Sequence, residues 1–164
     1  MKNLEDYRIK TDKLVKIGEE NFLESFLSKP NGLQEMFGLS DEVLNVYYNA
    51  ALQMLEEKRW NDAADAFLFL STLNPGVQSY WIGAGIAEQS QNNFGDALQY
   101  YVVAESIDPH DPVLHANAFQ CNLALDDMET AKIFYFQALE CCGEKEEHAA
   151  IKAKLEAYRL QLQT

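Results

Sequence analysis

Apolar residues along this chain recur every three or four positions, the spacing at which one face of an α-helix becomes hydrophobic. Short breaks rich in polar residues, glycine and proline separate the apolar runs. The pattern predicts six central helices over residues 41–57, 60–73, 77–91, 94–106, 112–125 and 128–141. It also predicts an amphipathic helix over 11–28, a short helical turn at 33–37 and a final helix over 144–163. The chain is therefore predicted to be all-α.

The six central helices carry an internal repeat with a spacing of 34 residues. In each second helix an alanine recurs, with an aromatic residue after it and a large residue before it. The first helices share an aromatic and a small residue, and proline or glycine ends each pair. These positions are Ala63, Ala97 and Ala131; Phe67, Tyr101 and Tyr135; Trp60, Phe94 and Met128; Tyr47 and Trp81; Ala51 and Gly85; and Pro75, Pro109 and Gly143.

Each residue type in the repeat has a physical reason. Two antiparallel helices approach closely only where small side chains lie at the crossing, so the repeated alanines are expected to face Ala51 and Gly85. A proline after the second helix cannot continue it and forces a turn. The pattern is that of the tetratricopeptide repeat. It predicts a solenoid of three helix-turn-helix repeats with an N-terminal amphipathic helix and a C-terminal capping helix.

The predicted boundaries follow from this repeat. The N-terminal helical region covers 1–38, the repeats cover 39–145 (44–77, 78–111 and 112–145) and the cap covers 146–164.

Two helix starts carry capping signals. Ser40 precedes two acidic residues that favour the positive end of a helix dipole. Asp111 precedes Pro112, which is suited to the first helical position.

The acidic charge is concentrated in the repeats. The chain has a formal net charge of −13 from 26 acidic and 13 basic residues, and residues 31–145 hold 17 of the acids and four of the bases. Such a surface repels a phosphate backbone, so no nucleic acid partner is expected. The charge is interpreted as keeping apolar faces from self-association, with a specific basic ligand as the alternative.

Cellular setting is predicted from what the sequence contains and lacks. The chain has no run of eighteen apolar residues and no N-terminal pattern of a secretory signal, so no stable membrane insertion is expected. Its three cysteines are an odd number, and Cys141 and Cys142 are adjacent. Because this is not a disulfide framework, a reducing, cytoplasmic setting is predicted.

The first helix of each repeat is expected to line the concave face. Helical periodicity places repeat positions 5, 9 and 12 on one inward stripe. The stripe carries no Lys, Arg or Asn, which disfavours a clamp for charged peptide tails. It suits an extended segment with apolar or proline side chains, whose backbone the two glutamine amides would bond. The stripe comprises Tyr48, Leu52, Leu55, Ile82, Ile86, Gln89, Ala116, Gln120 and Leu123. The alternative is that Leu52, Leu55, Ile86 and Leu123 are core residues.

Taken together, these residues resemble the class II chaperones of bacterial type III secretion, the family of SycD, LcrH and IpgC. The segment Trp81–Gln89 is similar to the family's aromatic-Leu-Gly-Leu-Gly-x-x-x-Gln stretch. Residues Arg59–Ala63 resemble its basic-Tyr-x-x-Ala turn, and Cys121 and Leu123 fall where its third repeat has Cys-Leu-Leu. The resemblance covers the whole chain. It implies a small acidic cytoplasmic chaperone that keeps a hydrophobic translocator or effector client soluble and export-competent.

The resemblance also implies how a client is held. In that family the concave groove takes an extended Pro-x-Leu-x-x-Pro segment of the client, and the matching pocket positions here are Tyr48, Leu52 and Leu55. Family members usually show aromatic residues at these positions, and Lys58 stands where the family has glycine. These departures concern the identity of the client more than the role.

No combination of residues indicates catalysis. His110, His115 and His148 share no motif spacing with one another or with carboxylates. His110 is expected in a solvated turn and His115 at a packing position of the third repeat. Gly83 and Gly85 are expected inside a helix for close packing rather than in a phosphate-binding loop. No enzyme activity, cofactor or metal is therefore expected.

Two functions of different classes stay open. The first is the secretion chaperone, and the second is a scaffold or assembly protein that binds a soluble partner through the same groove. The N-terminal helix over 11–28 could pack on the repeats, engage the client or pair two protomers. The family resemblance implies a weak homodimer through this region.

Overall fold

The computed structural model describes residue 29 and residues 31–159, and no strand occurs among them. The all-α prediction is confirmed, and each bound of the six central helices agrees with its predicted position to within one residue. The predicted helix over 11–28 lies outside the described residues. In chain order the elements are α3 (Gly32–Phe37), α4 (Asp41–Glu56), α5 (Trp60–Leu73), α6 (Gln78–Ser90), α7 (Phe94–Ile107), α8 (Pro112–Ala124), α9 (Met128–Cys142), the 3₁₀ turn η3 (Glu146–His148) and α10 (Ala149–Tyr158).

The last helix begins later than predicted. The predicted start was residue 144, whereas α10 begins at Ala149 after the 3₁₀ turn η3. Gly143, with a φ of 51°, ends α9 and turns the chain, and the extended Lys145 follows before the turn begins. Residues 160–163 of the predicted helix lie outside the described residues.

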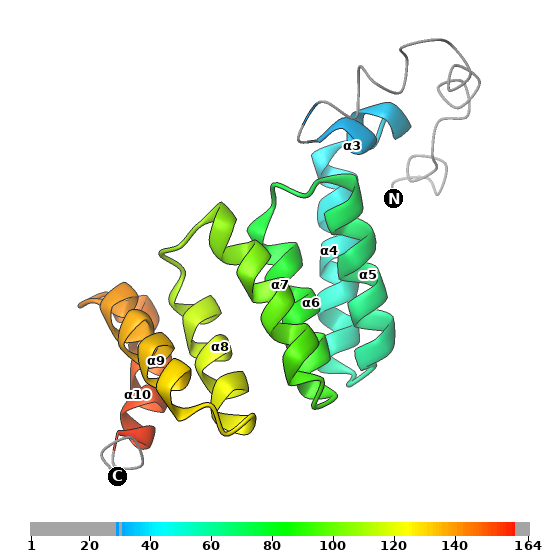
Figure 1. The fold of residues 1–164 in the computed structure, drawn as a ribbon. Coiled ribbons are helices and arrows are strands. Elements are labelled where there is room, and N and C mark those ends of the chain that lie inside the picture. The colour runs from blue at the N-terminus through cyan, green and yellow to red at the C-terminus, as the bar shows by residue number, and fades with distance from the viewer. Residues whose placement is uncertain (1–28, 30, 160–164) are drawn as a thin grey trace.

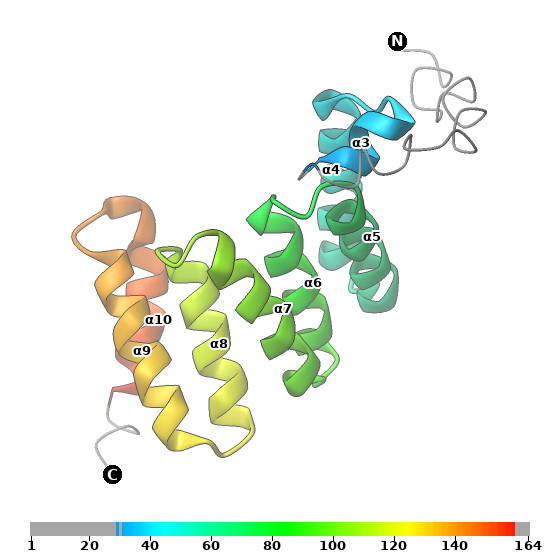
Figure 2. The same ribbon diagram turned by 45° about the horizontal axis from the view of Figure 1, so that its top comes forward.

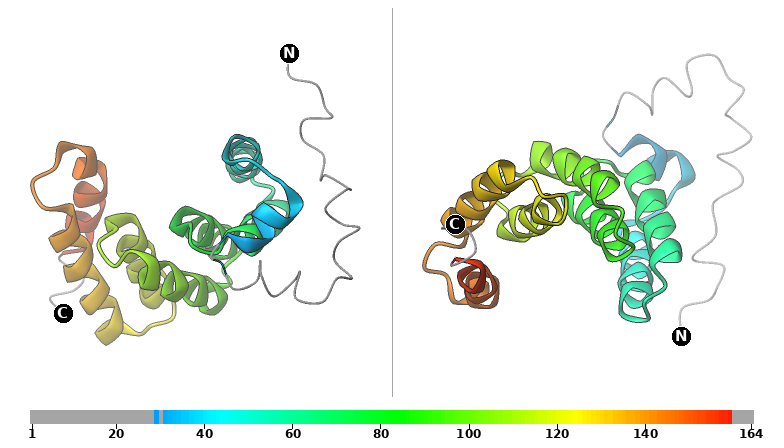
Figure 3. Two further views of the ribbon diagram at one scale, coloured as in Figure 1. Left: turned by 90° about the horizontal axis from the view of Figure 1, so that it is seen from above. Right: turned by 60° about the horizontal axis from the view of Figure 1, so that its bottom comes forward.

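The helices stack side by side as antiparallel pairs (Figure 1). The pairs α4–α5, α6–α7 and α8–α9 follow one another along the array, with α3 near one end and α10 at the other (Figure 2). Seen from two further directions, the array is a curved arc. Its inner side is formed by α4, α6, α8 and α10, and its outer side by α5, α7 and α9 (Figure 3). The predicted solenoid of helix-turn-helix repeats is therefore confirmed.

The core is divided among the repeats. Each of its three clusters joins one helix pair to the next helix along: α4 and α5 with α6, α6 and α7 with α8, and α8 and α9 with α10. Phe67 and Phe119 are fully buried, and burial of a side chain of this size stabilises the fold by roughly 1.5–3 kcal/mol. Leu155 of α10 is also buried, and the ring of Tyr158 lies edge-on to Phe119. The final helix therefore covers the open end of the array, as predicted.

The repeated small residues lie at close helix contacts. Ala51, Ala63, Ala97 and Ala131 are all 0% exposed. At Gly85 the nearest neighbour is an aromatic ring, because a Cβ there would overlap the ring of Tyr101 in α7. A Cβ at Gly83 would lie 2.5 Å from Cε1 of Phe67, in the preceding pair. Helix α6 is therefore held against an aromatic ring of both neighbouring second helices, and only glycine leaves room for them.

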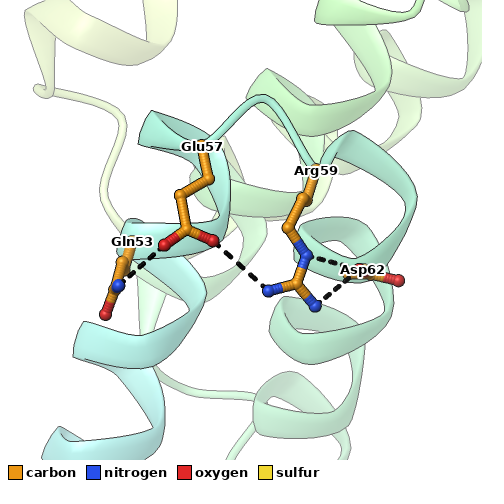
Figure 4. Close-up of polar contacts among 4 residues, drawn as sticks. All are labelled: Gln53, Glu57, Arg59 and Asp62. Atoms are coloured by element: carbon orange, nitrogen blue, oxygen red, sulfur yellow. Dashed lines mark hydrogen bonds and ion pairs between the residues drawn. The ribbon is translucent and has the colours of Figure 1, made fainter.

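The turn inside each pair repeats in the backbone although the sequence shows no common turn residue. Lys58, Asn92 and Asp126, spaced 34 residues apart, all adopt left-handed backbone with φ of 60°, 66° and 59°. Arg59 follows Lys58, and its guanidinium bonds the carboxylates of Asp62 and Glu57 across the first turn (Figure 4). The hydrogen bond to Asp62 is the main cause that raises the pKa of Arg59.

The two predicted helix caps differ in the structure. The Asp111 carboxylate accepts a hydrogen bond from the backbone N–H of Val113 at 2.7 Å, and Pro112 is the first residue of α8, as predicted. Ser40 occupies the N-cap position of α4, but its side chain makes no capping hydrogen bond. The α4 start therefore depends on the acidic residues of its first turn rather than on the serine hydroxyl.

Candidate functional site

The nine predicted groove residues lie on the three inner helices of the repeats (Figure 3). All except Ile82 are half-buried. Half-burial allows a side chain to pack on the core with one part and to offer the rest to a ligand. The residues are Tyr48, Leu52 and Leu55 of α4, Ile82, Ile86 and Gln89 of α6, and Ala116, Gln120 and Leu123 of α8.

Tyr48 shows how the first inner helix is anchored. Its ring lies edge-on to Phe67 with centroids 5.9 Å apart, and its centroid is 5.7 Å from that of Tyr80. Leu52 and Leu55 pack partly against the same cluster. Burial raises the pKa of the Tyr80 phenol, and the Asp41 carboxylate raises it further. Tyr80 is therefore uncharged at neutral pH, and this end of the groove offers aromatic and aliphatic surface.

Unlike the other eight groove residues, Ile82 is buried. It is 8% exposed and belongs to the cluster that joins α6, α7 and α8. The interpretation of Ile82 as an open groove residue is therefore corrected for this conformation, because neighbouring helices already cover its side chain. Ile86, on the same helix, remains half-buried and packs against that cluster from the outside.

The two groove glutamines bond each other rather than standing separately. The Gln89 side-chain N–H₂ donates to the carbonyl oxygen of Gln120 at 3.1 Å, and the Tyr101 hydroxyl donates to the Gln89 carbonyl oxygen at 2.8 Å. This chain of hydrogen bonds ties α6 to both α7 and α8. Gln89 is thus already engaged within the fold, and a client backbone bonding there has to share or replace these contacts.

The groove ends at a wall that the repeat positions did not predict. Ala116 and Gln120 line a cavity of about 100 Å³ together with Asn117 of the same helix and residues of the capping helix. Among these is Lys154, which places a basic side chain at this end. The repeat pattern stops before α10, so no repeat position pointed to it. The sequence signal that could have found this wall is the apolar spacing of the final helix itself.

Buried groups behind the groove are neutral. Burial is the largest cause raising the pKa of the Tyr101 phenol, and burial raises the pKa of the Cys121 thiol to about 12. A thiol in this state is protonated at neutral pH and is a poor nucleophile. Cys121 thus acts as a small apolar core residue in α8.

The histidines lie where the packing pattern placed them. His115 is buried, and its ring stacks at a tilt 6.0 Å from Phe134, whereas His110 is exposed in the turn after α7. In the described part of the chain, no group of three or more His, Cys, Asp or Glu side chains is placed to hold a metal ion. Within the same residues, no helix combines the length and hydropathy needed to cross a membrane.

Comparisons with known proteins support the resemblance seen in the sequence. No family model matches the chain. The chain is 23% identical over 143 residues to the Low calcium response locus protein H of Yersinia pestis, and the match covers 85% of each of the two chains.

Solved structures extend the comparison to the fold. PcrH, in a crystal structure with the chaperone binding region of PopD, is 26% identical, with a TM-score of 0.73 over 77% of this chain and 95% of that one. The Yersinia enterocolitica type III secretion chaperone SycD, in complex with a peptide of the translocator YopD, shares the fold at 20% identity. Its TM-score is 0.73 over 77% of this chain and 96% of SycD. The resemblance to the type III secretion translocator chaperones is thus confirmed.

Proposed function

We propose that this chain is a chaperone of a bacterial type III secretion system. It binds a hydrophobic translocator or effector client along its inner groove and keeps that client soluble and export-competent in the cytoplasm. It acts by binding and not by catalysis. The observation that carries the proposal is the half-buried apolar stripe along α4, α6 and α8, in a fold shared with chaperones crystallised with translocator segments.

The stripe supports an extended client segment rather than a helical one. Packed helices lie about 8–10 Å apart, and about three residues of extended chain span that distance. Client side chains two or three positions apart therefore reach pockets on neighbouring inner helices. A Pro-x-Leu-x-x-Pro segment has this spacing. Proline also suits the site because it restricts the unbound segment to extended conformations, so the segment loses little conformational entropy on binding.

The two ends of the groove differ in chemistry. At the α4 end, Tyr48, Leu52 and Leu55 offer aromatic and aliphatic surface. At the α8 end, the cavity shared with α10 adds the amide of Asn117 and the ammonium of Lys154. A client segment whose apolar anchors lie on α4 and α6 and whose polar or acidic residues lie toward α10 would match this gradient.

The test is capture of the bound protein from the native cytoplasm, with mass spectrometry of what stays bound. Tyr48→Glu and Leu52→Glu place a charge in the stripe, and Val102→Glu, at a residue 62% exposed on the outer helix α7, is the matched control. We expect wild type and the control to retain a larger secreted protein with predicted membrane segments, and both groove variants to lose it.

Two other results would change the assignment. Recovery of only soluble apparatus or regulatory proteins would favour the alternative, a scaffold or assembly protein that uses the same groove. A groove variant that has lost helix content or melts well below wild type would show that the residue is core. Ile82→Glu is unsuitable for this test, because a glutamate carboxylate at this buried position would itself destabilise the fold.

The N-terminal region is proposed to pair two protomers weakly. Removal of residues 1–30 should then lower the mass measured by light scattering from that of a dimer toward that of a monomer. An unchanged mass would assign this region to the client or to the repeats instead.

A further inference from the structure

The cavity of about 100 Å³ between α8 and α10, at the end of the apolar groove, has a chemistry of its own. Its polar lining side chains are those of Asn117, Gln120, Lys154 and Tyr158, and none of the described lining residues is acidic. One water molecule needs about 10–15 Å³ of such space, so the cavity has room for the three heavy atoms of a carboxylate. The apolar stripe of the inner helices offers no comparable set of donors.

The hydrogen bonds of the groove leave Gln120 with a donor group available. Tyr101 donates to Gln89 at 2.8 Å, and Gln89 donates to the carbonyl oxygen of Gln120 at 3.1 Å. The N–H₂ group of Gln120 has no hydrogen-bond partner among the residues that the structure describes. Hydrogen bonds in a chain polarise one another, which strengthens the donor at its end. Asn117 lies three positions earlier on the same face of α8 and adds a second amide to the cavity wall.

Lys154 supplies a positive charge that the described part of the fold does not neutralise. Its neighbour Lys152 pairs with Glu144 at 3.5 Å, whereas no described carboxylate forms an ion pair with Lys154. The side chain of Lys154 is exposed, and its flexible aliphatic stem lets the ammonium turn toward a ligand in the cavity. A carboxylate accepts about four hydrogen bonds, so an ammonium and two amides together match its requirements.

We propose that this cavity binds the carboxylate of an Asp or Glu side chain of the client. The inference rests on the proposed function, because the groove along α4, α6 and α8 brings the client segment to the cavity. Neighbouring helices lie about 8–10 Å apart, which about three residues of extended chain span. The acidic residue therefore lies about three positions beyond the apolar anchor on α8. Lys154 pairs with the carboxylate, and the amides of Asn117 and Gln120 donate to its oxygens.

The overall charge of the protein makes this selectivity easy to recognise. With a formal net charge of −13, the chain repels an acidic peptide at long range. General electrostatics therefore predicts that an acidic peptide binds more weakly than a neutral one of the same shape. Tighter binding of the acidic peptide requires a local site that outweighs this repulsion.

The experiment is fluorescence anisotropy of the full chain with dye-labelled synthetic peptides. Each peptide contains Pro-Ala-Leu-Ala-Ala-Pro flanked by alanines. Two peptides carry an Asp three positions before or after this segment, which tests both chain directions, and two matched peptides carry Asn instead. We expect one of the acidic peptides to bind about three- to tenfold more tightly than its Asn counterpart, as a charge-assisted contact at a partly exposed site allows.

Variants assign the preference to the cavity. Lys154→Met, which keeps most of the stem, should abolish the difference between the two peptides, and Lys154→Arg should retain it. Lys132→Met, on the outer helix α9, removes the same charge from the protein and should leave the difference unchanged. Asn117→Ala should reduce the difference without changing the affinity for the neutral peptide.

The outcomes separate this inference from the function on which it rests. Equal or weaker binding of both acidic peptides, or a preference that survives Lys154→Met, would overturn the inference while the neutral peptides still report an apolar groove. If no peptide binds wild type more tightly than it binds Tyr48→Glu, the groove assignment itself fails, and this inference fails with it.

Discussion

Replacing Gly85 by alanine tests whether α6 and α7 are as close as the structure shows. A Cβ at Gly85 would lie 2.8 Å from both Cδ1 and Cζ of the Tyr101 ring and nearer still to Cε1. Favourable carbon–carbon contacts lie at about 3.5–4.0 Å. Tyr101 cannot swing aside freely, because it is 2% exposed and its hydroxyl donates to Gln89. The added methyl group must therefore push the helices apart or displace the ring.

The expected magnitude combines two opposing contributions. Overpacking of a well-packed core costs about 1–3 kcal/mol, and the overlap with three atoms of a buried ring places this site in the upper part of that range. Alanine in a helix interior is favoured over glycine by about 1 kcal/mol. The free energy of unfolding should therefore fall by about 1–2 kcal/mol. For a chain of this length, this lowers Tm by about 2–8 °C.

The measurement is urea unfolding followed by circular dichroism at the helix band, compared with Gly95→Ala. A Cβ at Gly95 meets nothing within 4 Å, so that variant should gain up to about 1 kcal/mol from helix propensity alone. The two glycine substitutions should thus act in opposite directions. If Gly85→Ala unfolds at the same urea concentration as wild type or a higher one, the helices are not packed at the distance described here.

Three further outcomes are expected. Lys58→Gly should raise the free energy of unfolding by about 0.5–1 kcal/mol in the same assay, because a φ of 60° strains a side chain with a Cβ. Asp111→Ala should lower it by about 1 kcal/mol through loss of the N-cap hydrogen bond, whereas Ser40→Ala should have less than half that effect. Under native conditions Cys141, which is half-buried, should react with iodoacetamide well before Cys121, which is 0% exposed and whose thiol pKa is raised to about 12. Mass spectrometry of the labelled peptides measures the two rates. Equal rates would show that the core opens.

The repeat could be predicted from the sequence because the contacts that define it are local. Each helix pair closes within one repeat, so the alanine at its crossing and the aromatic residue four positions later recur at a constant spacing. Those residues, such as Ala97 and Tyr101, are buried as the pattern required. The helix bounds could be predicted for the same reason, since an amphipathic stripe and its breaks are properties of a single segment.

The turns were less predictable. Lys58, Asn92 and Asp126 share one left-handed conformation, yet only asparagine and aspartate are residue types that favour it. Lysine itself does not favour that conformation, and the sequence signal for it lies only in the alignment of Lys58 with Asn92 and Asp126 at the repeat spacing. The conformation at Lys58 arises because α4 and α5 pack against each other and the short connection between them has to close.

Residue types alone therefore determined that this chain is a helical repeat with an apolar stripe along one side of its first helices. Which members of that stripe stay accessible was decided only by the tertiary structure. Tyr48 and Ile82 occupy equivalent repeat positions, but Ile82 lies under its neighbours, and Gln89 is bonded to the next helix. The physical reason is that burial depends on the distances between helices, which are set by contacts such as Gly83 with Phe67 and Gly85 with Tyr101. Those distances are properties of the stacked array, and no single helix specifies them.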